Sequence, residues 1–180
     1  MKKILVELKN YLTPRLTVLP QHCSMKDPAI FLATWFGSGL LRPAPGTWGS
    51  LAAIPFGILI HWLFGFYGFL AAIVILFPIG VWAAQKFDEK SGAHDSGTIV
   101  IDEVVGIWIA AIPAATNIWI WLIAFILFRI FDIFKPWPVW WADEDLDGGW
   151  GVMCDDVVAG VYALFGTSMI TLPFMGVLYV

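Results

Sequence analysis

Apolar stretches of membrane-spanning length or longer follow one another along the chain, with polar loops between them. They cover residues 47–64, 66–84, 98–134 and 157–180. A transmembrane helix needs about 20 mostly apolar residues. Residues 47–64 and 66–84 are therefore predicted to form a helical hairpin that turns at Gly65, and residues 157–180 are predicted to form a single final span.

The stretch 98–134 is too long for one helix that crosses a bilayer. At about 1.5 Å per residue, a single helix would overshoot a bilayer of about 30 Å by a wide margin. Pro113 and Asn117 interrupt the stretch, so two short helices joined by a tight turn fit it best. Residues 28–41 are also apolar but too few to cross, and we expect a re-entrant or interfacial half-helix there.

These elements predict an all-α integral membrane protein with about five transmembrane helices plus one re-entrant or interfacial half-helix. Residues 1–27 mix charged and apolar positions and lack the apolar stretch of a secretory signal. We expect them to form a cytoplasmic or interfacial N-terminal segment. Residues 28–180 are expected to form a single membrane-embedded domain.

Composition agrees with this class of protein. Of the residues, 59% are hydrophobic and 13% are charged, with a mean hydropathy of +0.80, whereas soluble domains carry about 25% charged residues. The net charge of -4 arises from local acidic clusters, which indicates lipid or metal as the partner rather than nucleic acid. Cys23 and Cys154 have no CxxC spacing and predict neither a disulfide framework nor a zinc site.

The charged residues are confined to one side of the predicted fold. When the path is folded back and forth, the loops 42–49, 85–97 and 135–151 fall together, and the turns near Gly65 and Asn117 fall on the opposite side. With the amino terminus on the loop side, all 10 Lys and Arg and all 14 Asp and Glu lie on or just below that side. Positive residues in short loops favour the cytoplasm, so the charged face is expected to be cytoplasmic.

Several of these charges lie at predicted helix ends, where desolvating a charge is costly and usually serves a function. They are Asp102 and Glu103; Arg129, Asp132 and Lys135; and Asp155 and Asp156, with Asp95 in the preceding loop. Carboxylates gathered at membrane depth repel one another unless protons or cations lie between them. A divalent cation held by oxygen ligands accounts for the cluster. For Arg129 with Asp132 alone, an ordinary ion pair within one helix is the alternative.

The candidate metal ligands are these helix-end acids, Asp102, Glu103, Asp132, Asp155 and Asp156. Adjacent helical residues point about 100° apart, so one acid of each adjacent pair is expected to face the site, and either member fits the spacing. The candidate phosphate-binding residues are Arg42, Arg129 and Lys135, since arginine suits two-point contact and lysine acts as a point charge. A metal with nearby cations is typical of phosphoryl chemistry, for which the candidate catalytic residues are Asp95, Asp102, Glu103, Asp132 and Asp156.

Two other motifs suggest chemistry that their surroundings do not support. Residues 143–148 copy the first half of a calcium-binding EF-hand loop, but the twelfth position is Cys154 rather than the Glu that such a loop requires. A solvated acidic turn is the favoured interpretation. Cys154 also resembles the nucleophile of a cysteine phosphatase, yet the arginine expected six residues later is Gly160.

Beyond these general features, a set of motifs in matching order resembles one known family from about Pro28 to past Gly160. The motifs are Gly37-Ser38-Gly39-Leu40, Pro45-Gly46-Thr47, His94-Asp95, Asp102-Glu103, Phe128-Arg129-Ile130-Phe131-Asp132-Ile133-Phe134-Lys135-Pro136-Trp137-Pro138 and Gly148-Gly149-Trp150-Gly151-Val152-Met153-Cys154-Asp155-Asp156-Val157-Val158-Ala159-Gly160. Together they closely resemble the bacterial phosphatidylglycerophosphatase A family.

The resemblance implies a Mg²⁺-dependent, multi-pass lipid phosphatase of the bacterial inner membrane with its active site on the cytoplasmic face. Such an enzyme removes the terminal phosphate of phosphatidylglycerophosphate to give phosphatidylglycerol in phospholipid biosynthesis. The acidic pairs, Asp95, Asp132 and the basic residues match positions of the family's motifs. The acidic loop 143–147 departs from the family pattern, so Asp147 receives no role from the resemblance.

One rival function and two mechanisms stay open on the sequence, and a second rival lacks its signature. A cation transporter or channel also uses intramembrane acids, although charge confined to one face argues against a pathway across the bilayer. A phosphatidyl-group transferase with metal-bound aspartates would carry a longer aspartate signature than this chain has. Within the phosphatase, an acid either positions an attacking water or accepts the phosphoryl group as an aspartyl-phosphate.

Overall fold

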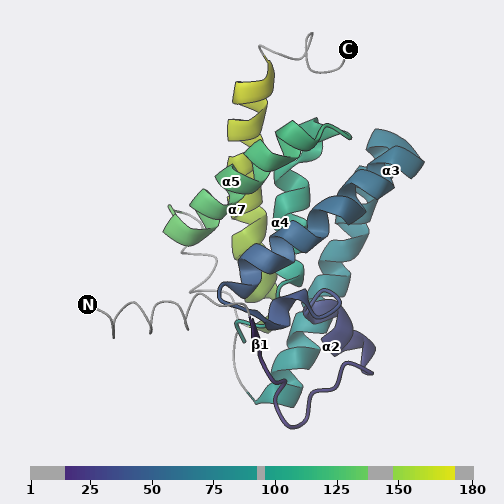
Figure 1. The fold of residues 1–180 in the computed structure, drawn as a ribbon, viewed down its shortest axis with the longest axis vertical. Coiled ribbons are helices and arrows are strands. Elements are labelled where there is room, and N and C mark those ends of the chain that lie inside the picture. The colour runs from purple at the N-terminus through teal and green to yellow at the C-terminus, as the bar shows by residue number, and fades with distance from the viewer. Residues whose placement is uncertain (1–14, 93–95, 138–147, 173–180) are drawn as a thin grey trace.

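The computed structural model describes residues 15–92, 96–137 and 148–172, and these form a bundle of helices (Figure 1). In chain order, the elements are β1 (Arg15–Leu16), α2 (Pro28–Ala33), η1 (Ser38–Leu40), β2 (Leu41–Arg42), α3 (Pro45–Ser91), α4 (Ile101–Ala110), η2 (Ile112–Ala114), α5 (Ile118–Phe134) and α7 (Gly148–Thr171), where η denotes a 3-10 helix. Residues 143–147 of the acidic loop lie outside the described residues, as do the first 14 residues of the predicted N-terminal segment.

The predicted hairpin is confirmed by α3, which consists of two helical arms. Its helical geometry breaks at Gly65, where φ is 66° and ψ is -168°. This region of backbone space is open to glycine and costly for other residues. In Figure 1 the first arm, residues 45–64, and the second arm, residues 66–91, meet at one end of the molecule, and the second arm runs back toward the other end.

The predicted division of residues 98–134 into two short helices is also confirmed. Helix α4 ends at Ala110 and is followed by η2, which contains Pro113. Asn117 then caps α5, because its side chain accepts hydrogen bonds from the Trp119 and Ile120 backbone N–H groups. Nine of the ten residues of α4 are buried, so this helix forms the centre of the bundle.

Helices α4 and α7 approach each other closely where two glycines meet. A Cβ built on Gly160 would lie only 2.6 Å from the carbonyl oxygen of Gly106. Small residues at such a crossing let two backbones approach, as in packed membrane helices. Glu103 lies three residues before Gly106, and Asp156 lies four residues before Gly160, so the crossing brings both acids to the same level of the bundle.

The predicted half-helix over residues 28–41 is shorter than expected, because α2 ends at Ala33. Trp35 and Phe36 take positive φ values of 43° and 59°, which end the α-helix before η1 begins. Asp27 caps α2, and its carboxylate also forms an ion pair with Lys90 at the end of α3. Thus α2 is fixed to the end of the second arm of α3, and its entry into a membrane stays a prediction.

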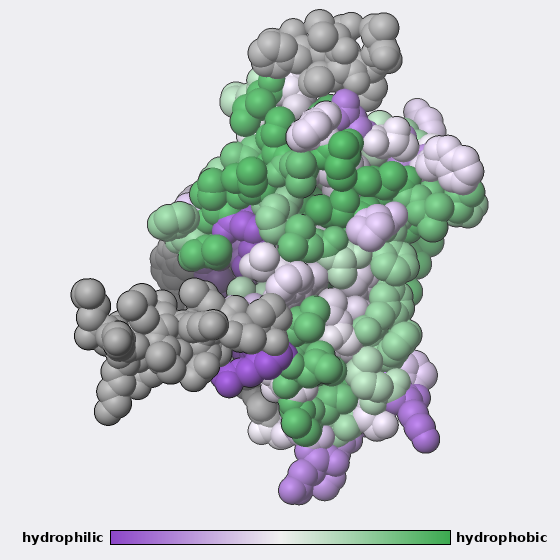
Figure 2. Space-filling model, viewed as in Figure 1, coloured by the Kyte–Doolittle hydropathy of each residue, from purple (hydrophilic) through white to green (hydrophobic). Residues whose placement is uncertain are grey.

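The described surface is rich in large apolar side chains, which Figure 2 shows as green areas over much of the bundle. Strongly exposed examples are Trp62, Phe64, Tyr67, Trp119, Phe165 and Met169. Within the described ranges, α3 and α7 are long and apolar enough to cross a membrane. The predicted total of about five spans stays a prediction, since α4 has ten residues and α5 has 17.

Candidate active site

Three carboxylates from three helices converge inside the bundle. Glu103 is on α4, Asp132 is on α5 and Asp156 is on α7, and each offers an oxygen within 4.8 Å of the others. We call these three residues the acidic triad. Glu103 and Asp156 are buried, and Asp132 is half-buried. Asp156 lies eight residues beyond Gly148, the first residue of α7, so the triad is about 12 Å along the helix from its start.

Arg129 connects two members of the triad. Its Nη1 atom lies 2.9 Å from Asp132 Oδ2 and also forms an ion pair with Glu103 Oε2. The predicted pair within α5 is therefore present, but the same guanidinium also joins α5 to α4. Arg129 Nε is buried and has no hydrogen-bond partner among the described residues, and a buried donor of this kind calls for an acceptor.

The start of α3 supplies two contacts that the sequence had not indicated as site residues. Ser50 Oγ lies 2.9 Å from Glu103 Oε2 and 2.8 Å from the Gly46 carbonyl oxygen. A Cβ on Gly46 would lie 2.8 Å from Glu103 Cδ and 3.1 Å from Arg129 Nη1. The glycine thus leaves room for the carboxylate. Gly46 is part of the Pro45-Gly46-Thr47 motif, and Ser50 follows it by one helical turn. This spacing was the available sign that both residues lie near the site.

Asp102 and Asp155, the neighbours of Glu103 and Asp156 in the sequence, are not members of the triad. Asp102 Oδ1 accepts a hydrogen bond from the Glu103 N–H at 2.9 Å. Asp155 accepts one from the Asp156 N–H at 2.9 Å, and its other oxygen lies 3.1 Å from Lys135 Nζ. The structure therefore turns Glu103 and Asp156 toward the site, and Lys135 forms an ion pair with Asp155.

The remaining predicted residues lie elsewhere. Arg42 is on β2, where it pairs with Arg15 of β1, and its Nε donates a hydrogen bond to Thr17 Oγ1 at 3.0 Å. It lines a separate cavity rather than the triad. Asp95 lies outside the described residues.

The donor set of the triad fits a divalent metal. Carboxylate oxygens are the ligands that Mg²⁺ prefers, and a Mg²⁺ site in proteins commonly uses few carboxylates together with water and substrate oxygens. If all three acids are ionised, their three negative charges meet the single positive charge of Arg129. An excess of two negative charges in a largely buried place is unfavourable, and a divalent cation would balance it.

Comparisons with known proteins agree with the motifs. A family model described as Phosphatidylglycerophosphatase A matches residues 31–171. The chain is 48% identical to phosphatidylglycerophosphatase A of Haemophilus influenzae over 143 residues, which cover 78% of this chain and 87% of that protein. It is 44% identical to phosphatidylglycerophosphatase A of Escherichia coli over 155 residues, which cover 81% and 89%.

A third relative carries a different name. The chain is 44% identical over 149 residues to a Bacteroides thetaiotaomicron protein described provisionally as a phosphatidylinositol-3-phosphatase, with 77% of this chain and 92% of that protein covered. No solved structure matches the chain. The match to most of the chain and the two relatives of the same name lead to one conclusion: the chain belongs to the phosphatidylglycerophosphatase A family.

Proposed function

We propose that this protein is a Mg²⁺-dependent lipid phosphatase that hydrolyses phosphatidylglycerophosphate to phosphatidylglycerol and phosphate. The prediction of an enzyme, a phosphoric monoester hydrolase, is confirmed by the family to which the chain belongs. One observation carries the finer proposal: three carboxylates from separate helices converge beside an arginine that keeps a buried, unpartnered donor.

The described residues have different roles in the proposed reaction. Glu103, Asp132 and Asp156 would hold the metal, which when bound supplies positive charge against the phosphoryl oxygens. Arg129 is already fixed by two of these acids, so its guanidinium is positioned before substrate arrives. Its free Nε–H would donate to a phosphate oxygen and support the charge that develops on the phosphoryl group.

The contacts to Glu103 restrict its carboxylate to one position. Ser50 approaches Oε2 from α3, and Arg129 pairs with the same oxygen from α5. Such supporting contacts orient the groups that hold a metal and raise its affinity. An acid of the triad would also position or deprotonate the attacking water.

We further propose that the chain is a multi-pass protein of the bacterial inner membrane with the triad open to the cytoplasmic face. The exposed apolar side chains of α3, α5 and α7 support contact with lipid. The absence of Lys, Arg, Asp and Glu from residues 47–84, 104–128 and 157–180 supports the same arrangement. A cation transporter is not favoured, because the family and the one-sided charge both argue against it.

The test is phosphate release by the purified full-length chain in neutral detergent. We expect chelation to abolish release from phosphatidylglycerophosphate and added Mg²⁺ to restore it. Lipid substrate should be hydrolysed at least about tenfold more efficiently than glycerol phosphate, a difference of about 1.4 kcal/mol. Phosphatidylinositol 3-phosphate belongs in the same assay because of the Bacteroides relative. Equal efficiency on glycerol phosphate would overturn the lipid substrate, and full activity in chelator would overturn the metal.

Substitutions test the assignment of the triad. Asp132→Asn and Asp156→Asn keep the side-chain volume but remove the charge, so we expect at least about a hundredfold lower activity from a folded protein. Asp102→Asn is the matched control, because Asp102 lies beside the triad without joining it. If the two triad variants keep rates close to that of the control, the metal site is elsewhere.

A further inference from the structure

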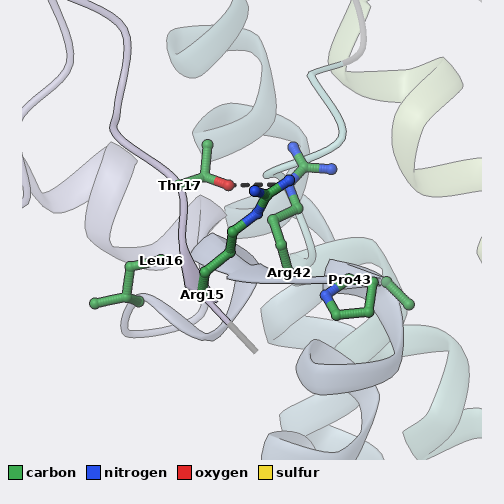
Figure 3. Close-up of a pocket in the computed structure, with 6 residues that line it drawn as sticks. Arg15, Leu16, Thr17, Arg42 and Pro43 are labelled. Carbon is green, nitrogen blue, oxygen red and sulfur yellow. Dashed lines mark hydrogen bonds between the residues drawn. The ribbon is translucent and has the colours of Figure 1, made fainter. Parts of the chain in front are cut away.

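A second cationic site lies beside the triad, in a cavity formed where β1 pairs with β2. The cavity has a volume of about 520 Å³ and is lined by Arg15, Leu16, Thr17, Arg42, Pro43 and Ala44. Arg15 and Arg42 are direct partners in the antiparallel register. Figure 3 shows the Arg15 and Arg42 side chains extending in the same direction from the strand pair, toward Thr17.

Among the described residues, this arrangement leaves the positive charges of Arg15 and Arg42 without a carboxylate partner. Across the part of the chain that the structure describes, no carboxylate lies within ion-pair distance of Arg15 or Arg42. The one hydrogen bond between the lining side chains runs from Arg42 Nε to Thr17 Oγ1 at 3.0 Å. The Thr17 hydroxyl accepts that bond and keeps its own hydrogen for another acceptor. Two guanidinium groups and a hydroxyl donor are the groups that recognise phosphate oxygens.

The cavity adjoins the triad through the start of α3. Ala44 lines the cavity, and Gly46, two residues later, lies against the Glu103 carboxyl group. Two residues of extended chain span at most about 7 Å. Helix α3 also begins here without a capping side chain, and the positive end of the helix dipole adds to the attraction for an anion.

We propose that the Arg15–Arg42 cavity binds a second phosphate of the same lipid, the phosphodiester that joins its headgroup to its diacylglycerol. This inference rests on the proposed function, in which the terminal phosphomonoester lies at the triad. A site that reads two phosphates separated by a short carbon bridge selects lipids with both groups. It disfavours phosphatidic acid, which has a phosphomonoester and no phosphodiester. Arg15 is thereby assigned to substrate specificity, together with Arg42.

The test compares these two lipids in neutral detergent that contains no other anionic lipid. In Arg15→Gln and Arg42→Gln, we expect kcat/KM for phosphatidylglycerophosphate to fall at least about tenfold, mainly through a higher KM. The rate on phosphatidic acid should change less than about twofold. Lys26→Gln is the matched control, because it removes an exposed positive charge outside the cavity. Arg42→Lys should recover part of the loss, since it keeps the charge but not the two-point contact.

Each alternative gives a different result. If the loss emerges only when anionic lipid is added to the detergent, the cavity binds a neighbouring lipid and the inference is wrong. An equal loss of kcat/KM on both lipids would show that the arginines serve the triad or the fold, and this result would also overturn the inference. Unchanged selectivity between the two lipids would overturn it as well. If the unaltered protein releases phosphate from neither lipid, the proposed function fails first and the inference falls with it.

Discussion

Replacing Gly46 with alanine tests whether the position of the Glu103 carboxylate governs activity. The new Cβ would lie 2.8 Å from Glu103 Cδ and nearer still to Oε1. Carbon atoms in good contact are about 3.5–4.0 Å apart, so the carboxyl group must retreat by about 1 Å. The neighbouring Arg129 Nη1, 3.1 Å from the same Cβ, restricts where it can go.

A movement of this size is large for a catalytic group. Metal–ligand distances tolerate deviations of about 0.2 Å, and a misplacement of about 1 Å costs on the order of a hundredfold in rate. We therefore expect Gly46→Ala to lower kcat/KM about a hundredfold, which equals about 2.7 kcal/mol of lost transition-state stabilisation. The concentration of Mg²⁺ needed for half-maximal activity should rise as well.

The same substitution should leave the fold intact. Gly46 lies in the first turn of α3 with no positive φ, and alanine is a better helix former than glycine by up to about 1 kcal/mol. Crowding of the buried Glu103 carboxyl group costs about 1–3 kcal/mol, which this gain offsets in part, so the melting temperature should fall by only a few degrees. Gly97→Ala is the matched control, because a Cβ there meets nothing within 4 Å. If kcat/KM of Gly46→Ala stays within twofold of that of the unaltered enzyme, activity does not depend on the present position of the Glu103 carboxylate.

Two further predictions concern topology and pH. The topology is tested on a background without native cysteines, with an impermeant thiol reagent applied from outside. The reagent should label Thr116→Cys, an exposed position beside η2, and not Ser91→Cys. Labelling at position 91 would contradict the predicted topology. The ammonium of Lys90 holds the pKa of Asp27 below its usual range, so the carboxylate stabilises the fold at neutral pH and loses this effect as the pH falls through its lowered pKa. The difference in melting temperature between the unaltered protein and Asp27→Asn should therefore shrink from pH 7 to about pH 3, and a constant difference would contradict the ion pair's role.

Local sequence was enough to predict the breaks in the main helices, although α7 begins at Gly148, nine residues before the predicted final span. The turn at Gly65 and the division near Pro113 and Asn117 depend on residues whose backbone preferences act at the position where they stand. Tertiary contacts seldom override backbone preferences as strong as these. The motifs also carried the family resemblance, which the comparisons confirm.

The length of the half-helix was less predictable. Apolar character continues through residues 28–41, yet α2 stops at Ala33. Trp35 lies edge-on to the ring of Trp108, 6.0 Å away between centroids on α4. Hydropathy indicates that such a ring is buried, but it does not indicate which distant residue the ring packs against.

Sequence by itself therefore predicted that acids and cations near the ends of the apolar stretches gather in an apolar helical fold. Tertiary structure decided which members meet. Adjacent residues on a helix point about 100° apart, so the choice of Glu103 over Asp102 depends on how α4 is rotated about its axis. That rotation is fixed where Gly106 meets Gly160, more than 50 residues later in the chain. No local pattern contains this contact, and for the same reason the pairing of Arg42 with Arg15 emerges only in the folded chain.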